Sequence, residues 1–137
     1  MSAPEYLLRP VGYVRSSLKS RSEAPRQGNE GAPSASIEVE PAWRAGLSGI
    51  EVGHELIVLS WFHEARRDVL KLHPRNDRSL PVTGVFATRS PDRPNPIGLH
   101  RVRVLSVGDG SLEVEPLEAI DGTPIVDIKP VLAVADD

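Results

Sequence analysis

The 137-residue chain contains no cysteine, one methionine and few aromatic residues, which make up 4% of the sequence. Without cysteine, the chain can form neither a disulfide nor a thiolate metal site, and it has no thiol nucleophile. No apolar run approaches the roughly 18 residues of a membrane-spanning helix, and residues 1–10 lack the basic start and long apolar middle of a signal peptide. We therefore expect a cytoplasmic protein with no membrane contact, folded as a single domain over residues 1–137.

The sequence also lacks the familiar cofactor and nucleophile motifs. No G-x-G-x-x-G stretch opens a helix and no G-x-x-x-x-G-K-[S/T] loop occurs, which argues against the usual dinucleotide and nucleotide-phosphate sites. A G-x-S-x-G turn is absent as well. His54, His63, His73 and His100 show no H-x-x-x-H spacing. We therefore expect ordinary strand or surface histidines and no metal site.

Apolar residues recur mostly with period two, in short runs separated by Gly, Pro, Ser or Asp, which is typical of short strands. The expected strands are Leu7–Arg15, Ser36–Glu40, Glu55–Phe62, Asp68–His73, Gly84–Thr88, Leu99–Val107, Ser111–Leu117 and Ile125–Ile128, with one short helix at Trp43–Leu47. About eight short strands and little helix predict a mainly β fold, either a small barrel or a sandwich. The polar segment Arg15–Pro33 is expected to be a long loop, and residues 133–137 a frayed tail.

A hairpin centred on Gly108 is the clearest local prediction. The expected pairs are Val104 with Leu112, Val102 with Val114, Arg103 with Glu113, and Arg101 with Glu115. This register makes one face of the hairpin apolar and the other face ion-paired.

The charge is distributed unevenly along the chain. Residues 63–103 contain nine Arg or Lys and four acids, whereas the remaining residues carry a net −8 within an overall charge of −3. A basic region on an acidic body suits an anionic partner that docks in one place, although a solvated charged surface would have the same composition.

Residues 88–98, T-R-S-P-D-R-P-N-P-I-G, contain three prolines and two arginines. Prolines restrict the unfolded chain and so lower the entropic cost of ordering a loop. The stretch can therefore be a plain rigid turn, or a prearranged ligand loop in which Arg89 and Arg93 bind a carboxylate or phosphate and Asn95 pairs with a base edge or backbone group.

Several polar stretches occur together in the order found in the TsaA-like (TrmO) family. They are Pro25-Arg26-Gln27, Trp61-Phe62-His63, Gly84–Ser90 running on to Arg93–Gly98, and Asp121–Pro124 followed by Asp127–Pro130. The chain resembles this family over about Val11–Leu132. It departs from the common pattern at Glu118, where the family commonly has Asp, and at Val131, where Tyr is usual.

The resemblance implies a TsaA-like β-barrel, without a Rossmann fold, that works as a homodimer. It further implies an S-adenosylmethionine-dependent methyltransferase acting on N6 of threonylcarbamoyl-adenosine beside the anticodon of tRNA. By similarity, the cofactor contacts would be Pro25, Arg26, Gln27, His63, Glu64, Arg89, Leu99, Leu117 and Glu118. The substrate side would involve Asp121, Gly122, Thr123, Asp127 and Lys129, with Arg93 and Asn95 near the substrate or the dimer seam.

Roles for these residues follow from the chemistry of the implied cofactor. Arg89 or Arg26 could bind its carboxylate as a fork, and Glu64 or Glu118 would favour its sulfonium. The urea-like target nitrogen is a poor nucleophile, so Asp121 or Asp127 is the expected general base. Lys129 would orient one of them or bind the threonyl carboxylate, although Asp127 and Lys129 could also be a simple surface ion pair.

Two other functions fit the same residues. One is a non-catalytic module that senses S-adenosylmethionine and docks a partner. The other is a methyltransferase for a small molecule or a different RNA.

Overall fold

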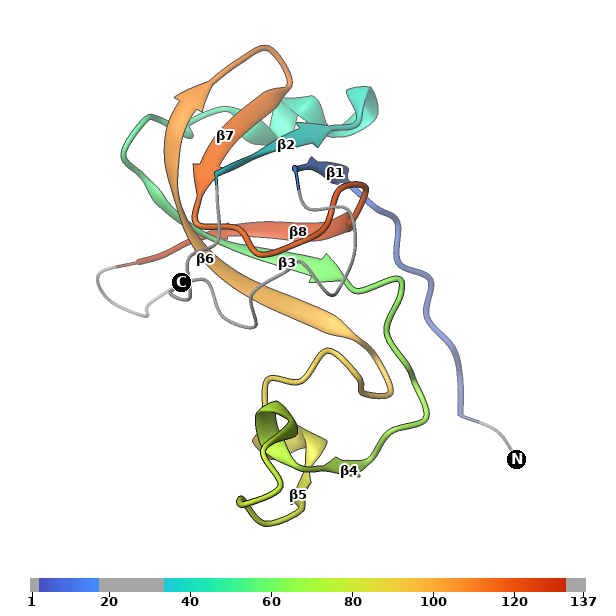
Figure 1. The fold of residues 1–137 in the computed structure, drawn as a ribbon. Helices are drawn as coiled ribbons and strands as arrows, with labels where there is room; N and C mark the ends of the chain where they lie inside the picture. The colour runs from blue at the N-terminus through green and yellow to red at the C-terminus, as the bar shows by residue number, and fades with distance from the viewer. Residues whose placement is uncertain (1–2, 18–33, 133–137) are drawn as a thin grey trace.

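The computed structural model describes residues 3–17 and 34–132. Within these ranges, six strands close into an antiparallel barrel in the order β1-β2-β7-β6-β3-β8 (Figure 1). The barrel strands are β1 (Gly12–Arg15), β2 (Ala35–Val39), β3 (Glu55–Trp61), β6 (Ile97–Val107), β7 (Ser111–Glu115) and β8 (Pro124–Pro130). The prediction of a mainly β, antiparallel barrel is confirmed.

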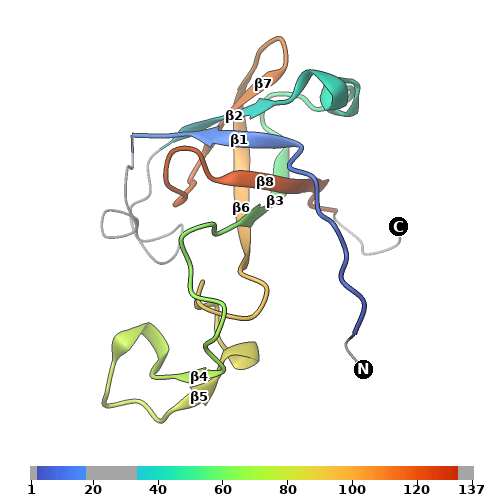
Figure 2. The ribbon, with the colours of Figure 1, turned by 90° about the vertical axis from the view of Figure 1, so that its right-hand side faces the viewer.

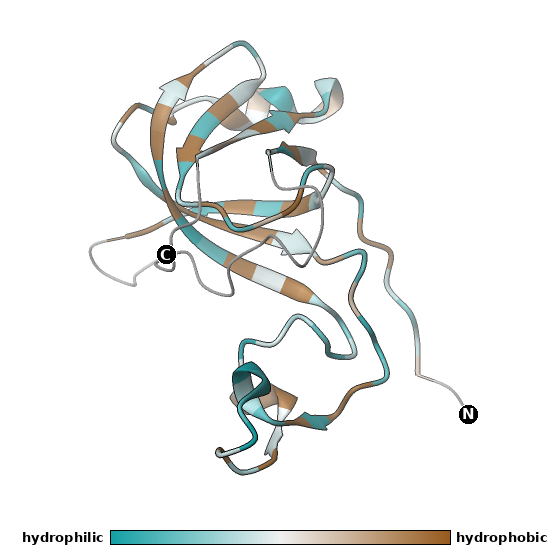
Figure 3. Cartoon of the chain, viewed as in Figure 1, coloured by the Kyte–Doolittle hydropathy of each residue, from teal (hydrophilic) through white to brown (hydrophobic). Residues whose placement is uncertain are grey.

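Strand alternation builds the interior of the barrel. Along β6, Gly98, His100, Val102 and Val104 are buried, while the residues between them face outward. The other strands and the β7–β8 connection contribute mainly branched aliphatic side chains to this core, among them Val14, Ile37, Val58, Leu112, Val114, Leu117 and Ile125. Apolar and polar residues alternate visibly along these strands (Figure 3). The period-two pattern of the sequence therefore identifies the buried face correctly.

A small lobe lies outside the barrel, between β3 and β6 in the chain (Figures 1 and 2). It contains the two-stranded sheet of β4 (Lys71–Leu72) and β5 (Thr83–Gly84), and the 3₁₀ helices η3 (Pro74–Asn76) and η4 (Val85–Ala87). The expected strands Asp68–His73 and Gly84–Thr88 are thus mostly wrong. Around η4 only Val85 is buried, so this apolar run forms one turn with a single inward side chain instead of a pleated strand.

Two other element boundaries also differ from expectation. β1 begins only at Gly12, because residues 3–10 have no strand partner in the described structure and Tyr6–Leu8 are exposed. The expected short helix is present as the 3₁₀ helix η2 (Pro41–Leu47), which begins at a proline as first turns often do.

The β6–β7 hairpin exists, but its predicted register is wrong. Val104 pairs with Val114 and Val107 pairs with Leu112, with a bulge between Val104 and Ser106. The tip lies at Gly108–Gly110, where Gly110 has a φ of 80° that suits glycine. The bulge inserts one residue and so returns Val104 to the apolar face. Arg103 consequently meets Glu115, and Arg101 bonds instead to Glu55 of β3 at 2.5 Å.

We predict that Leu112→Ala lowers the free energy of unfolding by about 2–5 kcal/mol, because it leaves a cavity in the closed barrel. Leu7→Ala is the matched control, since Leu7 is 93% exposed and its truncation should change stability by less than about 0.5 kcal/mol. Urea titration followed by circular dichroism measures both. Equal effects at the two positions would contradict the assigned interior.

Candidate functional site

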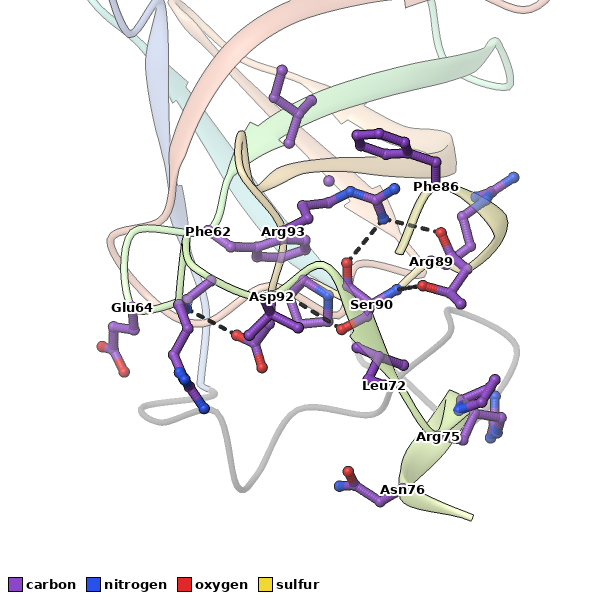
Figure 4. A pocket seen from close by; sticks show the side chains of 18 of the residues that line it. Phe62, Glu64, Leu72, Arg75, Asn76, Phe86, Arg89, Ser90, Asp92 and Arg93 are labelled. Atoms are coloured by element: carbon purple, nitrogen blue, oxygen red, sulfur yellow. Dashed lines mark hydrogen bonds between the residues drawn. The ribbon is translucent and has the colours of Figure 1, made fainter. Parts of the chain in front are cut away.

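A cleft of about 1230 Å³ lies between the barrel and the β4–β5 lobe (Figure 4). Its walls come from the segment after β3, from the lobe, from the loop 88–93, and from the start of β6. Glu118, Ile120 and Thr123, on the connection between β7 and β8, also line it. In the sequence these lining residues fall in three separate stretches, 62–76, 86–99 and 118–123. The cleft is large enough for a cofactor.

The proline-rich loop that borders the cleft is stiffened by its own short polar side chains. Thr88 Oγ1 donates to Val85 O and accepts from the backbone N–H of Ser90, at 3.0 and 3.2 Å. Ser90 Oγ accepts from the Asp92 N–H at 3.2 Å, and Asp92 Oδ1 accepts from the Arg66 N–H at 2.9 Å. These local turns fix the backbone before any ligand is present.

Arg93 is used inside this loop. Its guanidinium donates to the carbonyl oxygens of Thr88 and Ser90, both at 3.0 Å (Figure 4). It also donates to the carbonyl oxygen of Val85 at 2.8 Å. Arg93 lines the cleft, but these bonds engage both terminal nitrogens of its guanidinium in bracing η4 and the loop. The expected substrate contact of Arg93 stays a prediction that this geometry does not favour.

Asn95 lies outside the lining of the cleft and is bound from the barrel side. Arg67 donates to Asn95 Oδ1 at 3.2 Å and to Pro94 O at 2.7 Å, and its guanidinium stacks 5.1 Å from the centre of the Trp61 ring. Asn95 thus has a structural partner, and its expected substrate role stays a prediction.

Arg89 differs from Arg93 and Arg67, whose guanidinium groups are bonded to carbonyl oxygens of the loop. It lines the cleft and is exposed, and no residue of the described ranges bonds to its guanidinium. A planar group with unpaired donors on the wall of a cleft is suited to a carboxylate or a phosphate. Of the two arginines in the loop, Arg89 is therefore the one available to a ligand.

The segment after β3 also contributes charged groups to the lining of the cleft. His63 Nε2 lies 3.8 Å from Glu64 Oε2, and both side chains are partly exposed. Asp68 accepts two bonds from Arg66, which lower the pKa of its carboxyl, so this acid stays anionic. Because Arg66 lines the cleft beside Glu64 and Asp68, this part of the wall carries charges of both signs.

The least expected feature is a chain of hydrogen bonds at the end of the barrel. Ser60 Oγ lies 2.7 Å from His100 Nε2, and His100 Nδ1 lies 2.8 Å from Glu118 Oε1. Ser60 and His100 are buried, whereas Glu118 lines the cleft. Glu118 was expected at a site, but Ser60 and His100 were not. The available signal was that His100 shares strand parity with the buried Val102 and Val104.

The remaining expected residues are dispersed over the structure. Leu99 and Thr123 line the cleft, whereas Leu117 is fully buried in the core and is absent from the lining. Asp121 and Gly122 form the turn before β8, where Asp121 Oδ1 accepts from the Ser16 N–H at 3.0 Å, next to the lining residues Ile120 and Thr123. Pro25, Arg26 and Gln27 lie outside the described residues, as do the tail 133–137 and all of the expected loop Arg15–Pro33 except residues 15–17. Of these, Arg15 is the last residue of β1.

Asp127 and Lys129 lie on one exposed face of β8, outside the cleft lining. They form an ion pair of 3.4 Å, as the sequence suggested, and Asp127 also accepts from the Ile128 N–H. Within one copy of the chain, Asp127 and Lys129 therefore do not line the cleft, although both were expected on the substrate side of the site.

The described residues offer neither a candidate metal centre nor a membrane-spanning helix. They contain no cluster of three or more His, Asp or Glu side chains that could hold a metal ion. In the same ranges, no helix has the length and apolar character to span a membrane.

Comparisons with known proteins point to one family. The family model described as tRNA-methyltransferase O N-terminal domain matches residues 13–137. A probable S-adenosyl-L-methionine-binding protein of Methanothermobacter thermautotrophicus is 45% identical over 130 residues, which cover 95% of this chain and 93% of that protein. An S-adenosyl-L-methionine-binding protein of Archaeoglobus fulgidus is 42% identical, over 90% of this chain and 87% of its own.

The fold is also shared with a solved structure. TrmO from Pseudomonas aeruginosa superimposes with a TM-score of 0.73 and 33% identity, over 98% of this chain. The chain spans about three fifths of that longer protein, because the match covers 61% of it.

We predict that Gly98→Ala destabilises the protein by about 1–3 kcal/mol and disorders the cleft. A Cβ at this position would lie 2.5 Å from the Phe62 ring and 2.5 Å from Ser60 Oγ, so both must move. The control is Gly46→Ala in η2, where a Cβ would meet no atom within 4 Å and stability should hold or rise slightly. Urea unfolding compares the two, and an unaffected Gly98→Ala protein would contradict the packing described.

Proposed function

Because this chain belongs to the family of the tRNA-methyltransferase O (TrmO) N-terminal domain, we propose that it methylates N6 of threonylcarbamoyl-adenosine beside the anticodon of tRNA. Its cofactor is S-adenosylmethionine, the ligand in the names of its relatives. The observation that carries the proposal is the cleft, which combines the Arg89 guanidinium, bound by none of the described residues, with a carboxylate at Glu118.

The residues of the cleft fit this cofactor. S-adenosylmethionine supplies an electrophilic methyl group on a positively charged sulfonium, next to an amino-acid carboxylate. Arg89 would bind the carboxylate through two parallel hydrogen bonds. Glu118 and Glu64 would favour the positive charge, and Leu99 adds apolar surface on the same wall. Because the loop 88–93 is already held by Arg93, little ordering is required on binding.

The chemical step requires transfer of the methyl group to N6 and loss of one proton from that nitrogen. We propose Asp121 as the first candidate to accept the proton, because its turn adjoins the cleft-lining residues Ile120 and Thr123. Asp127 with Lys129 remains the second candidate, and would need the substrate or a second subunit to connect its face to the cleft. Positioning of the two reactants would supply much of the rate.

A homodimer is part of the proposal. Large apolar side chains are exposed on the lobe and on the adjoining end of β6, namely Leu70, Val82, Phe86, Ile97 and Leu99. Phe86 is 83% exposed, which is unusual for a phenylalanine unless a partner covers it. A second copy of the chain at this edge would also help to enclose the cleft.

An RNA partner is supported by basic residues on the same side of the molecule. Lys71, Arg75, Arg78 and Arg89 are exposed on the lobe or beside it. Phosphate neutralisation by such residues would give binding that weakens as salt rises. A tRNA substrate would place the protein in the cytoplasm.

The direct test is nucleoside mass spectrometry of tRNA that carries unmethylated threonylcarbamoyl-adenosine, after incubation with the protein and S-adenosylmethionine. We predict a methyl gain that falls by at least about tenfold in Arg89→Ala, since the variant removes the carboxylate fork. Arg103→Ala is the control, because it removes an exposed arginine paired only at 3.5 Å with Glu115 on another face.

Three outcomes of this experiment separate the candidate functions. Cofactor binding without any methyl gain would contradict the tRNA activity and favour the binding module. Formation of S-adenosylhomocysteine that continues after RNase treatment and is insensitive to salt would favour a small-molecule acceptor. Equal losses in Arg89→Ala and Arg103→Ala would remove Arg89 from the site.

A further inference from the structure

The barrel interior contains three buried polar residues among those described: Ser60, His100 and Thr123. Thr123 is satisfied locally, by donating to Ile120 O at 2.7 Å. Ser60 and His100 satisfy each other, and the chain of bonds then continues outward to Glu118 at the cleft. Burying an imidazole in an aliphatic barrel costs free energy, so this arrangement requires a reason beyond packing.

The partners assign the protons. Glu118 Oε1 is an acceptor, so His100 Nδ1 carries a hydrogen and donates it. Ser60 Oγ has no other partner in the described part of the chain, so its hydroxyl hydrogen is satisfied only if it is donated to His100 Nε2. The geometry therefore assigns the neutral imidazole with hydrogen on Nδ1, which leaves the negative charge on Glu118.

Packing against Phe62 also fixes the orientation of the His100 imidazole. The Phe62 ring meets it edge-on, at 5.7 Å between centroids and 80° between planes. Gly98 leaves room for this contact, because any side chain there would collide with both Phe62 and Ser60. The imidazole side chain is 1% exposed and that of Glu118 is 13% exposed, so the bond between them is shielded from water.

We propose that His100 and Ser60 form a positioning pair that holds the Glu118 carboxylate toward the cleft, where it selects the positively charged sulfonium of S-adenosylmethionine over the neutral thioether of S-adenosylhomocysteine. This inference rests on the proposed function, because it takes the cleft as the cofactor site. His100 fixes one oxygen of Glu118. No described residue bonds to the other oxygen, which is thus left for the ligand.

The selectivity has a direct physical origin. A carboxylate held by a buried donor cannot rotate away to solvent, so its charge stays at one place in the cleft. The two ligands differ mainly in the methyl group and the charge on sulfur, so their affinity ratio measures that charge. Overall affinity, by contrast, also depends on the rest of the cleft.

Isothermal titration of the 137-residue protein with each ligand tests the proposal. We expect His100→Leu to weaken S-adenosylmethionine binding by about tenfold while changing S-adenosylhomocysteine binding by less than about twofold. Glu118→Gln keeps the shape of the side chain and removes its charge, so it should lower the preference for S-adenosylmethionine over S-adenosylhomocysteine by a similar factor. His100→Asn can return a hydrogen-bond donor to the Nδ1 position and should recover part of the preference for S-adenosylmethionine.

Val102→Ala controls for stability, because it opens a cavity at the next buried position of β6 without touching the hydrogen bonds. Its affinity ratio should equal that of the parent protein. An unchanged ratio in His100→Leu, with binding retained, would overturn the inference while leaving the proposed function standing. Failure of the parent protein to bind either ligand would overturn the proposed function and the inference with it.

Nitrogen-15 NMR of the histidines tests the proton assignment without any ligand. We expect one neutral imidazole protonated on Nδ1, which Ser60→Ala should perturb because it removes the hydroxyl donor to Nε2. A neutral His100 with its hydrogen on Nε2 alone would overturn the positioning role, since Nδ1 could then no longer donate to Glu118.

Discussion

The ladder between β3 and β6 is the constraint on which the site depends. It pairs Glu55–Trp61 with Ile97–Arg103 without a register shift and sets Ser60 opposite Gly98. Because side chains alternate, this register directs Ser60, Gly98 and His100 to the interior. A slip of one residue would turn His100 to solvent and separate it from Glu118. The same ladder fixes the point at which both strands leave the barrel and the cleft begins.

The two arginines of the proline-rich loop, four residues apart, differ in what their guanidinium groups contact. Arg93 binds three carbonyl groups of its own loop, whereas Arg89 has its guanidinium unpaired among the described residues. These contacts show a braced turn, and the binding of a ligand by this loop belongs to the proposed function. The loop is rigid because Arg93 and the hydroxyl groups of Thr88 and Ser90 hold it, and that rigidity presents Arg89 to the cleft.

The sequence predicted what depends on local pattern. Period-two alternation identified the barrel strands, and the motif order identified the family that the comparisons confirm. It failed where tertiary contacts decide. The bulge at β6 changed the hairpin register, and the Val85–Ala87 run became a single turn because it has no ladder partner. Ser60 and His100 could not be joined to Glu118 from spacing alone, since Ser60 meets His100 through the β3–β6 ladder, 40 positions apart, and Glu118 comes from the β7–β8 connection, 18 positions after His100.

The central claim is that the cleft between the barrel and the lobe is where the cofactor is bound and its charge is recognised. A crystal structure of the protein with S-adenosylmethionine tests it most directly. Our account predicts the ligand in the cleft, with its carboxylate on Arg89 and its sulfonium beside Glu118. A ligand bound elsewhere, for example on the exposed face of β8 that carries Asp127 and Lys129, would contradict the account.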